Sequence, residues 1–408
     1  MDSPTPNPVD RTRLETRAIH AGENHASPAA SSAPDLVMSN SFIADPATGF
    51  SAETLRDDQP HVYTRWSNPT IARLEAAVAS LELCEDALCF ATGMAAVSGL
   101  LLHVLRPGDH LLVGDVIYAG ASELIRQRLP AMGIDVTAVD TSDCSAVRDA
   151  LRTNTRLLYV ETPCNPILRL TDLRAVADLA HQHGAGLVVD STLATPLATQ
   201  PVELGADWVI HSLSKYLGGH GDSLGGVVAG RREAIAALRK DSGVHLGGAM
   251  SPFNAWLIHR GVATLPVRMQ AHSANALRVA RFLQDHPHVA QVVYPGLESH
   301  PQHALAARQM RLPSGMLTFR LAKPAGQALS RIARRLRVVH YAVSLGHVRS
   351  LLFYLPTDEL LRTSFLLNPT QAAAYRGYAG DGIFRMSVGL ENPDDLCADL
   401  DQALSDVD

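Results

Sequence analysis

Lys215 is the residue of this sequence best suited to covalent chemistry. It lies in HSLSKYLGGHGD, His211 to Asp222, after an apolar run and before a group of glycines. A lysine among apolar neighbours loses proton affinity, and its amine then attacks carbonyl carbons. The glycines let the backbone approach a bulky ligand closely. Considered alone, Lys215 has an ordinary alternative as a surface lysine beside a loop.

Asp190 changes the interpretation of Lys215. It ends the apolar run GLVVD, 25 residues before Lys215, a spacing that suits neighbouring strands. Pyridoxal 5′-phosphate (PLP) needs a carboxylate opposite its pyridine nitrogen, because the protonated ring then accepts electrons from a substrate carbanion. An aspartate that caps a turn at a strand end is the alternative. The two residues together favour a PLP site.

Three segments predict where a phosphate would bind. Gly93 and Met94 follow a strand candidate and open an Ala-rich helical stretch, so their N–H groups would point at an anion. Ser212 and Ser214 add hydroxyl groups. Arg65, in YTRWSNPT, adds a balancing positive charge. For Gly93 alone, a plain strand-to-helix turn is the alternative.

Two further side chains are placed to contact a cofactor or a substrate. Tyr118 follows a strand candidate, and its ring is suited to lie on a flat cofactor. Arg385 lies in the apolar strand candidate FRMSVGLE, where an unpaired guanidinium is costly. The carboxylate of an amino-acid substrate would satisfy it in a bidentate way. The alternatives are an ordinary half-buried tyrosine and a structural ion pair of the arginine.

An alternation of apolar runs and helical stretches must position these residues, and it predicts an α/β fold with a mainly parallel sheet. The apolar runs cover 87–91, 110–115, 156–161, 186–190 and 208–212. The helical stretches cover 70–83, 94–105, 119–129, 143–152 and 172–183, with Asp143 and Thr171 as helix N-caps. Ligands bind beyond the carboxyl ends of such strands. Those ends carry Asp115, Glu161, Asp190 and Ser212.

The two ends of the chain predict further regions. Residues 1–60 are rich in Pro, Ser, Ala and Asp, which predicts an N-terminal arm that contacts a neighbouring subunit. A smaller α+β domain is predicted over 256–408, after a large domain over 61–255. Its elements are a helical segment at 252–285, strand candidates at 289–294, 315–321 and 383–389, and a helix from 393.

Composition and charge exclude several classes of protein. A hydrophobic content of 46% and a charged content of 19% are those of an ordinary globular protein. A net charge of −6 without a polybasic run argues against nucleic acid as a partner. The five cysteines lack zinc-like spacing, so no metal and no disulfide framework is expected, and a cytoplasmic location fits best. Neither a signal sequence nor a membrane span is predicted.

Taken in order, the motifs resemble the Cys/Met-metabolism family of PLP enzymes, the trans-sulfuration enzymes, over nearly the whole chain. The motifs are TRAIHAGE, YTRWSNPT, FATGMAAV, ETPCNP, VVDSTLATP, HSLSKYLGGHGD, AVSLG and FRMSVGLE. The resemblance is nearest to the methionine γ-lyases, cystathionine γ-lyases and cystathionine γ-synthases. It implies PLP as cofactor and the aspartate-aminotransferase-like fold, fold type I, with a smaller C-terminal α+β domain.

The resemblance also implies residue roles on the cofactor. Lys215 would carry it as a Schiff base and shuttle protons between the substrate Cα and Cβ, and Asp190 would hold the pyridine nitrogen. Tyr118 would lie on the ring and assist the leaving group, and Glu161 would support the surroundings of the ring. The phosphate would be bound by Gly93, Met94, Ser212 and Ser214.

The same resemblance implies shared active sites and a substrate anchor. Tyr63 and Arg65 would reach the phosphate in the neighbouring subunit, within a homotetramer built as a dimer of dimers, and Tyr63 joins the catalytic candidates. Asn165, Ser344 and Arg385 would orient the cofactor hydroxyl and the substrate α-carboxylate. The substrate is then a small amino acid.

Within the family, Lys240-Asp241-Ser242-Gly243 resembles the γ-lyases more than the synthases. This favours γ-elimination on a γ-substituted L-amino acid through a vinylglycine-like intermediate, and γ-replacement of the cystathionine γ-synthase or O-acetylhomoserine sulfhydrylase type is the alternative. A non-catalytic protein with a PLP-enzyme fold is a third, weaker hypothesis, because Lys215, Asp190, Tyr118 and Arg385 are all present.

Three departures from the family pattern concern the substrate. Gly120 stands where methionine γ-lyases commonly carry cysteine, Arg349, after His347, replaces a common glutamate, and the stretch 350–371 differs from the usual segment. As a substrate-binding residue, Arg349 would disfavour a distal ammonium group, so an oxygen-linked substrate such as canavanine stays open. Alternatively, Arg349 points to solvent or pairs with Asp358 or Glu359.

Overall fold

The computed structural model describes residues 11–23, 31–46, 51, 60–326, 328–365 and 367–405. They form two compact units, which we describe separately. Unit 1 takes its described residues from Met1–Val104 and Gln200–Pro266, and unit 2 takes its own from Leu105–Thr199 and Val267–Asp408. Each unit therefore combines two segments that are distant in the sequence.

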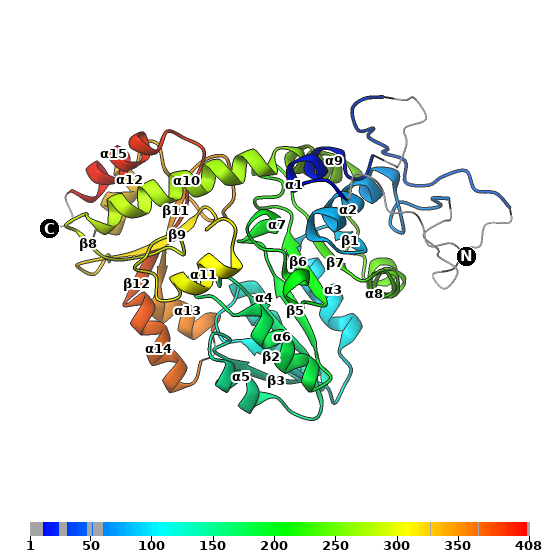
Figure 1. Cartoon of the computed structure of the whole chain (residues 1–408), viewed down its shortest axis with the longest axis horizontal. Coiled ribbons are helices and arrows are strands. Elements are labelled where there is room, and N and C mark those ends of the chain that lie inside the picture. Colours follow the sequence, from blue (N-terminus) through cyan, green and yellow to red (C-terminus); the bar gives the residue numbers. More distant parts are fainter. Residues whose placement is uncertain are drawn as a thin grey trace. The chain divides into compact units, whose positions relative to one another are not determined.

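The helices are labelled in Figure 1. Unit 1 contains α1 (Leu14–His20), α2 (Pro69–Glu82), α3 (Gly93–Val104), η5 (Pro201–Leu204), α8 (Arg232–Leu238), η6 (Arg239–Gly243) and α9 (Pro252–Ala263). The helices before the second segment of unit 2 are α4 (Ala119–Glu123), η3 (Leu124–Arg128), η4 (Pro130–Met132), α5 (Cys144–Ala150), α6 (Leu173–Gln182) and α7 (Thr195–Ala198). The second segment of unit 2 contains α11 (His303–Gln309), α12 (Leu329–Arg335), α13 (Thr357–Thr363), α14 (Pro369–Ala379) and α15 (Pro393–Leu404), together with all but the first two residues of α10 (Leu265–Gln284).

Unit 1 contains three antiparallel strands in the order β1 (Asp86–Phe90), β7 (Gly226–Gly230) and β6 (Trp208–Ser212). Helix α2 packs on β1 and α9. It begins at Asn68, whose side chain accepts a hydrogen bond from the Thr70 N–H at 2.9 Å. Helix α3 follows β1 closely in the chain and contacts β6 and β7. The N-terminus of α3 and the end of β6 therefore belong to one packed layer.

Unit 2 contains four parallel strands in the order β5 (Gly186–Asp190), β4 (Thr155–Glu161), β2 (His110–Gly114) and β3 (Asp135–Val139). Every residue of β2 is buried, as expected for a parallel strand covered on both faces. The His110 ring joins β2 to both neighbours, because its nitrogens lie 2.8 Å from Thr155 Oγ1 and 2.9 Å from Thr137 Oγ1.

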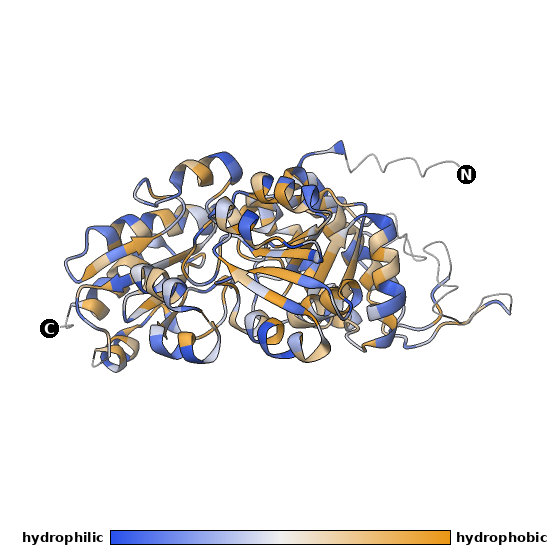
Figure 2. Cartoon of the chain, turned by 90° about the horizontal axis from the view of Figure 1, so that it is seen from below, coloured by the Kyte–Doolittle hydropathy of each residue, from blue (hydrophilic) through white to orange (hydrophobic). Residues whose placement is uncertain are grey.

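The C-terminal part of unit 2 forms a second sheet in the order β10 (His340–Tyr341), β11 (Leu351–Pro356), β12 (Gly382–Ser387), β9 (Met316–Leu321) and β8 (Val289–Val293). Helices α10, α12 and α15 form one hydrophobic core with this sheet (Figure 1), which includes the stacked rings of Phe319 and Phe384. Figure 2 shows the resulting pattern, with apolar strands and helices that are apolar on one side and polar on the other. Each sheet thus buries its own apolar face.

These observations confirm the predicted architecture, a mainly parallel sheet and a second α+β sheet, together with the N-cap Asp143. Two details of the prediction are wrong. Thr171 does not cap α6, because the Asp172 side chain accepts from the Ala175 N–H at 3.3 Å and the Thr171 hydroxyl pairs with Thr141 at 2.7 Å. The predicted helix at 252–285 is two helices, α9 and α10. Pro266 cannot continue the hydrogen-bonding pattern of α9.

Parts of the prediction lie beyond these observations. The predicted arm over 1–60 falls in large part on residues 1–10, 24–30, 47–50 and 52–59, which lie outside the described residues. The domain boundaries after 60 and after 255 stay predictions. Among the helices that the structure describes, none combines the length and the hydropathy of a membrane span.

Candidate functional site

In unit 1, the predicted lysine and both serines lie at the end of β6 and in the turn that follows it. The Lys215 N–H donates to the Ser212 carbonyl at 3.2 Å, and the Gly219 N–H donates to the Lys215 carbonyl at 2.7 Å. The Ser214 hydroxyl donates to the Gly225 carbonyl at 3.2 Å and accepts from the Gly225 N–H at 3.0 Å. The Lys215 side chain is half-buried. The turn thus fixes the backbone on both sides of Lys215.

The N-terminus of α3 meets the end of β6. A Cβ atom added to Gly93 would lie 2.9 Å from the Ser212 Cβ, and one added to Gly226 would lie 2.2 Å from the Thr92 carbonyl oxygen. Glycine is therefore needed at both positions for the two segments to approach. The N–H groups of the first two residues of this 12-residue helix and the Ser212 hydroxyl form a cradle of the kind that binds phosphate.

Tyr63 and Arg65 lie side by side on the surface of unit 1. The Arg65 guanidinium lies over the Tyr63 ring, 5.5 Å from its centroid, and donates to the Val244 carbonyl. The Tyr63 residue is 37% exposed. Both side chains are thus accessible at the surface of this chain.

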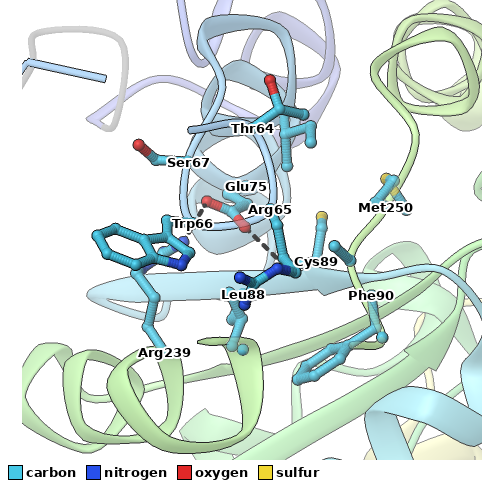
Figure 3. A pocket seen from close by; sticks show the side chains of 14 residues that line it. Thr64, Arg65, Trp66, Ser67, Glu75, Leu88, Cys89, Phe90, Arg239 and Met250 are labelled. Carbon is cyan, nitrogen blue, oxygen red and sulfur yellow. Dashed lines mark hydrogen bonds and ion pairs between the residues drawn. The ribbon is translucent and has the colours of Figure 1, made fainter. Parts of the chain in front are cut away.

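Figure 3 shows a pocket of unit 1 in which Arg65 is the only predicted site residue among the described lining residues. A buried ion pair lies in its wall, Glu75 with Arg239 at 3.0 Å, and Glu75 also accepts from the Cys89 N–H at 2.8 Å. Burial raises the pKa of Glu75 above its usual range, against the opposing effect of Arg239. These two charges compensate each other within the wall of the pocket.

In unit 2, two carboxylates end adjacent parallel strands. Glu161 of β4 and Asp190 of β5 are register partners, and both are buried. Asp190 accepts from the Thr192 N–H at 3.0 Å and from the Tyr159 hydroxyl at 3.3 Å. Burial, and next the charge of Asp190, raise the pKa of Glu161 well above its usual range. A cation is favoured beside such a pair, which fits the protonated pyridine nitrogen of PLP.

Glu161 connects two predicted site residues. One of its carboxylate oxygens accepts from the Tyr118 N–H at 2.5 Å, and the other accepts from the Asn165 N–H at 3.0 Å. Tyr118 itself is 47% exposed. The buried carboxylate therefore fixes the backbone of both residues, while the Tyr118 ring is left accessible to a ligand.

Arg385 of β12 joins the same network. Its Nη1 donates to Asn165 Oδ1 at 3.1 Å, and its Nη2 donates to the Ser344 carbonyl at 3.2 Å. Ser344 has a positive φ of 84°, a conformation that few residues other than glycine adopt. The charge of Arg385 also lowers the pKa of Glu161, against burial. The structure thus brings Arg385, Asn165 and Ser344 together.

Arg349 is placed differently from these residues. It is exposed, and its guanidinium has neither a hydrogen bond nor an ion pair with the part of the chain that the structure describes. Asp358, one of its suggested partners, pairs instead with Arg376 at 2.6 Å. Among the described residues, Arg349 thus makes no polar contact with Arg385, Asn165 or Ser344.

Several residues that support the site were not predicted from the sequence. Tyr159 and Thr192 bind Asp190, and Gly226 admits the start of α3. In the residue before Ser212, His211 Nε2 lies 2.5 Å from Glu82 Oε1, and neither side chain is exposed to solvent. The alternation of residues along β6 is a signal for His211, since it must point away from Ser212. The other contacts join residues that no local pattern relates.

Unit 1 holds Lys215 and the cradle at Gly93 and Ser212, and unit 2 holds the buried Asp190, the accessible Tyr118 ring and Arg385. Among the described residues, no group of three or more His, Cys, Asp or Glu is arranged to hold a metal ion.

Comparisons with known proteins agree with this chemistry. The chain is 38% identical over 399 residues to L-methionine gamma-lyase of Porphyromonas gingivalis, covering 97% of this chain and 98% of that protein. It is 39% identical to canavanine gamma-lyase of Pseudomonas canavaninivorans, covering 96% of both. The solved cystathionine gamma synthase of Xanthomonas oryzae pv. oryzae, in complex with aminoacrylate and cysteine, superimposes with a TM-score of 0.87 at 35% identity, covering 97% of this chain and 98% of that one.

The family description "Cys/Met metabolism PLP-dependent enzyme" matches residues 15–405. The predicted fold type I is thereby confirmed, as is PLP as the cofactor. The relatives named above are, by name, two gamma-lyases and a gamma synthase. The chain belongs to the Cys/Met-metabolism family of PLP-dependent enzymes, the trans-sulfuration enzymes.

Proposed function

We propose that this enzyme is a γ-lyase that removes the γ-substituent of an L-amino acid. The substrate and one water molecule give a 2-oxo acid, ammonia and the protonated leaving group. Methionine is the first substrate class, and an oxygen-linked amino acid such as canavanine is the second. The observation that carries the proposal is the similarity to relatives named for these two eliminations, over 96% or more of the chain.

The segment Lys240–Gly243, which resembles the γ-lyases, supports the proposal from within the chain. Ser242 is buried and its hydroxyl donates to the Gly99 carbonyl at 2.7 Å, and Asp241 lies 2.8 Å from the His103 ring. Both partners lie on α3, the helix that begins at Gly93. The segment thus positions the helix whose first residues are proposed to hold the phosphate.

PLP supplies an electron sink for the substrate carbanion when it is bound. In our proposal, Gly93, Met94, Ser212 and Ser214 hold its phosphate, together with Tyr63 and Arg65 of a neighbouring subunit. Asp190 holds the pyridine nitrogen in its protonated form. Tyr118 covers the ring, Asn165 orients the ring hydroxyl, and Glu161 fixes the backbone of both.

Lys215 moves the protons in this proposal. Its amine takes a proton from Cα and, after it has given that proton up, takes a second proton from Cβ, which prepares the bond to the γ-substituent for cleavage. We infer that Tyr118 and Tyr63 protonate the leaving group. Arg385, with Asn165 and Ser344, holds the substrate α-carboxylate. Arg349 acts on the distal end of the substrate, where its charge disfavours an ammonium group.

γ-Replacement is the second candidate, because a solved cystathionine γ-synthase is 35% identical to this chain. A transferase uses the same residues up to the loss of the leaving group. A thiol then adds at Cγ in place of net hydrolysis. The two candidates therefore differ only in the steps after the leaving group has departed.

We also propose a homotetramer in the cytoplasm, with each active site shared between two subunits. Apolar side chains of the segment 31–46 are exposed, with Met38 at 61% and Ile43 at 103%, and exposed apolar clusters mark protein interfaces. All five cysteines are free in the structure, which suits a reducing compartment.

The experiment that tests the function is a substrate panel read by product mass, with and without an added thiol. The PLP-loaded enzyme is given methionine, homocysteine, canavanine and O-acetylhomoserine, and Lys215→Ala serves as the inactive control. A lyase releases 2-oxo acid and ammonia without a thiol. Turnover only in the presence of the thiol would establish the transferase instead, and no turnover with any substrate would exclude both.

A further inference from the structure

The turn that follows Asp190 orients its carboxylate. Asp190 is the last residue of β5, and the Thr192 N–H donates to the carboxylate at 3.0 Å. The Thr195 N–H donates to the Ser191 carbonyl at 2.8 Å and closes the turn at the start of α7. A shift of this turn therefore shifts the hydrogen bond that orients the carboxylate.

This turn is unfavourable when it is considered by itself. Thr195 has a positive φ of 66°, a conformation that is strained for a β-branched residue. The hydroxyl groups of Ser191 and Thr195 are buried and have no hydrogen-bond partner among the described residues, which is also unfavourable. Contacts from outside the turn must therefore hold it.

Ser314 supplies such a contact from a distant part of the chain. Its hydroxyl donates to the carbonyl of Leu193, in the middle of the turn, and both residues are buried. Ser314 itself has a positive φ of 66°, where glycine is the favoured residue. The backbone would be more relaxed with glycine, and what the serine adds is the hydrogen bond to Leu193.

Ser314 is held on its other side by the second sheet of unit 2. Its carbonyl accepts from the hydroxyl of the buried Tyr294 at 2.8 Å. Strand β9 begins two residues after Ser314 and pairs with β12, where Thr318 is the register partner of Arg385. The segment that fastens the Asp190 turn is thus continuous with the strand beside the predicted substrate anchor.

We propose that Ser314 is a positioning residue for Asp190. Through the Leu193 carbonyl, its hydroxyl holds the strained turn in the conformation that orients the carboxylate, and it thereby raises the affinity for PLP. The inference rests on the role proposed for Asp190 at the pyridine nitrogen. It does not depend on whether the enzyme catalyses elimination or replacement, because PLP affinity is measured without turnover.

The experiment compares Ser314→Ala with Ser314→Gly. Both remove the hydroxyl, and only glycine relieves the strained φ. PLP is titrated into each apoprotein and followed by quenching of tryptophan fluorescence, and the Tm of each apoprotein is measured. We expect both variants to bind PLP about fivefold more weakly, the value of one lost hydrogen bond. Ser314→Gly should nevertheless have a Tm about 2 °C above that of Ser314→Ala.

The matched control is Ser405→Ala at the exposed end of α15. The Ser405 hydroxyl also donates to a backbone carbonyl, that of Asp401, at 2.6 Å. This variant loses the same kind of hydrogen bond far along the chain from the Asp190 turn, and it should bind PLP as the wild type does.

A double variant tests whether Ser314 acts through Asp190. Asp190→Asn should weaken PLP binding by itself, because a neutral amide does not favour the protonated pyridine nitrogen. Adding Ser314→Ala to Asp190→Asn should weaken binding no further, because the carboxylate that Ser314 positions is gone.

Three results would overturn the inference: a Ser314→Gly protein with wild-type PLP affinity, a Ser314→Ala effect that persists in full beside Asp190→Asn, or an Asp190→Asn protein that binds PLP as tightly as the wild type. In the last case the role proposed for Asp190 fails as well. If the wild type forms no 2-oxo acid while the affinities behave as expected, the proposed γ-lyase function fails and the role of Ser314 stands.

Discussion

Arg385, the predicted anchor of the substrate α-carboxylate, donates two hydrogen bonds, to Asn165 and to the Ser344 carbonyl. We expect Arg385→Lys to lower kcat/KM about hundredfold, mainly through KM, because an ammonium group cannot hold a carboxylate in a bidentate way. The absorbance of bound PLP should not change. Steady-state kinetics with methionine and the PLP spectrum check this.

The matched control is Arg376→Lys, which alters an exposed pair with Asp358 at 2.6 Å. An exposed ion pair contributes little to stability, so this variant should have the stability and the kinetic constants of the wild type. If Arg385→Lys kept its KM and lost only thermal stability, Arg385 would be a structural residue of β12 and no substrate anchor.

Residues whose roles depend on local order were accessible from the sequence. Asp190 and Ser212 end apolar strands, and Gly93 opens a helix, so each was placed at the correct end of its element. Tyr159 and Thr192 were not found, because their hydrogen bonds to Asp190 follow from strand packing and turn geometry. The contact of Ser314 with the Leu193 carbonyl was not found either, since it joins residues that are 121 positions apart in the sequence.

At the scale of elements, His110 links β2 to β3 and β4 and makes the stability of these parallel strands depend on pH. Burial, and next the charge of Arg152, lower the pKa of His110 to about 4. In the unfolded chain the pKa of this histidine is about 6.5, so the unfolded state binds the proton first as pH falls. The contribution of His110 to stability is therefore full above about pH 6.5 and is lost toward pH 4.

We expect His110→Gln to remove part of this dependence. Between pH 7 and pH 4.5, the urea midpoint of the wild type should fall more steeply than that of His110→Gln. His181→Gln, at an exposed histidine of α6, should keep the wild-type slope. Equal slopes for all three proteins would show that His110 titrates normally in the folded state.

The elements that were missed have weak local signals. Strand β3 is the edge strand next to β2, and four of its five residues are only half-buried. Its sequence therefore lacks a clear apolar run. Strand β7 begins and ends with glycine, which normally opposes strand formation. Its first glycine is kept because the Thr92 carbonyl occupies the space of a Cβ. In β7, tertiary contacts decide a structure that local propensity disfavours.

At the scale of the whole molecule, the proposed sharing of active sites makes a quantitative prediction. Lys215→Ala and Arg65→Ala should each be inactive, the first through its own site and the second through the site of its neighbour. Dissociated and reassembled together in equal amounts, they should recover about a quarter of wild-type activity. Half of the dimers are then mixed, and each mixed dimer has one intact site.

The control mixes Lys215→Ala with Asp190→Asn, two residues proposed to serve the same site. A mixed dimer then has a defect in both sites, and no activity should return. Absence of recovery in the first pair would show that Arg65 acts in its own subunit, and recovery in the control pair would show that Lys215 and Asp190 do not serve the same site. In the structure the Arg65 side chain donates one hydrogen bond to the Val244 carbonyl of the same chain, and a guanidinium has further N–H donors for a phosphate.

The glycine contacts of unit 1 have a consequence for redesign of the substrate range. A Cβ at Gly226 would lie 2.2 Å from the Thr92 carbonyl oxygen, and one at Gly261 would lie 2.1 Å from the Gly218 carbonyl oxygen. Both obstacles are backbone atoms, which cannot turn aside as a side chain can. A mutant library for new substrates should therefore leave Gly226 and Gly261 unchanged and concentrate its diversity on 116–121 and 344–371.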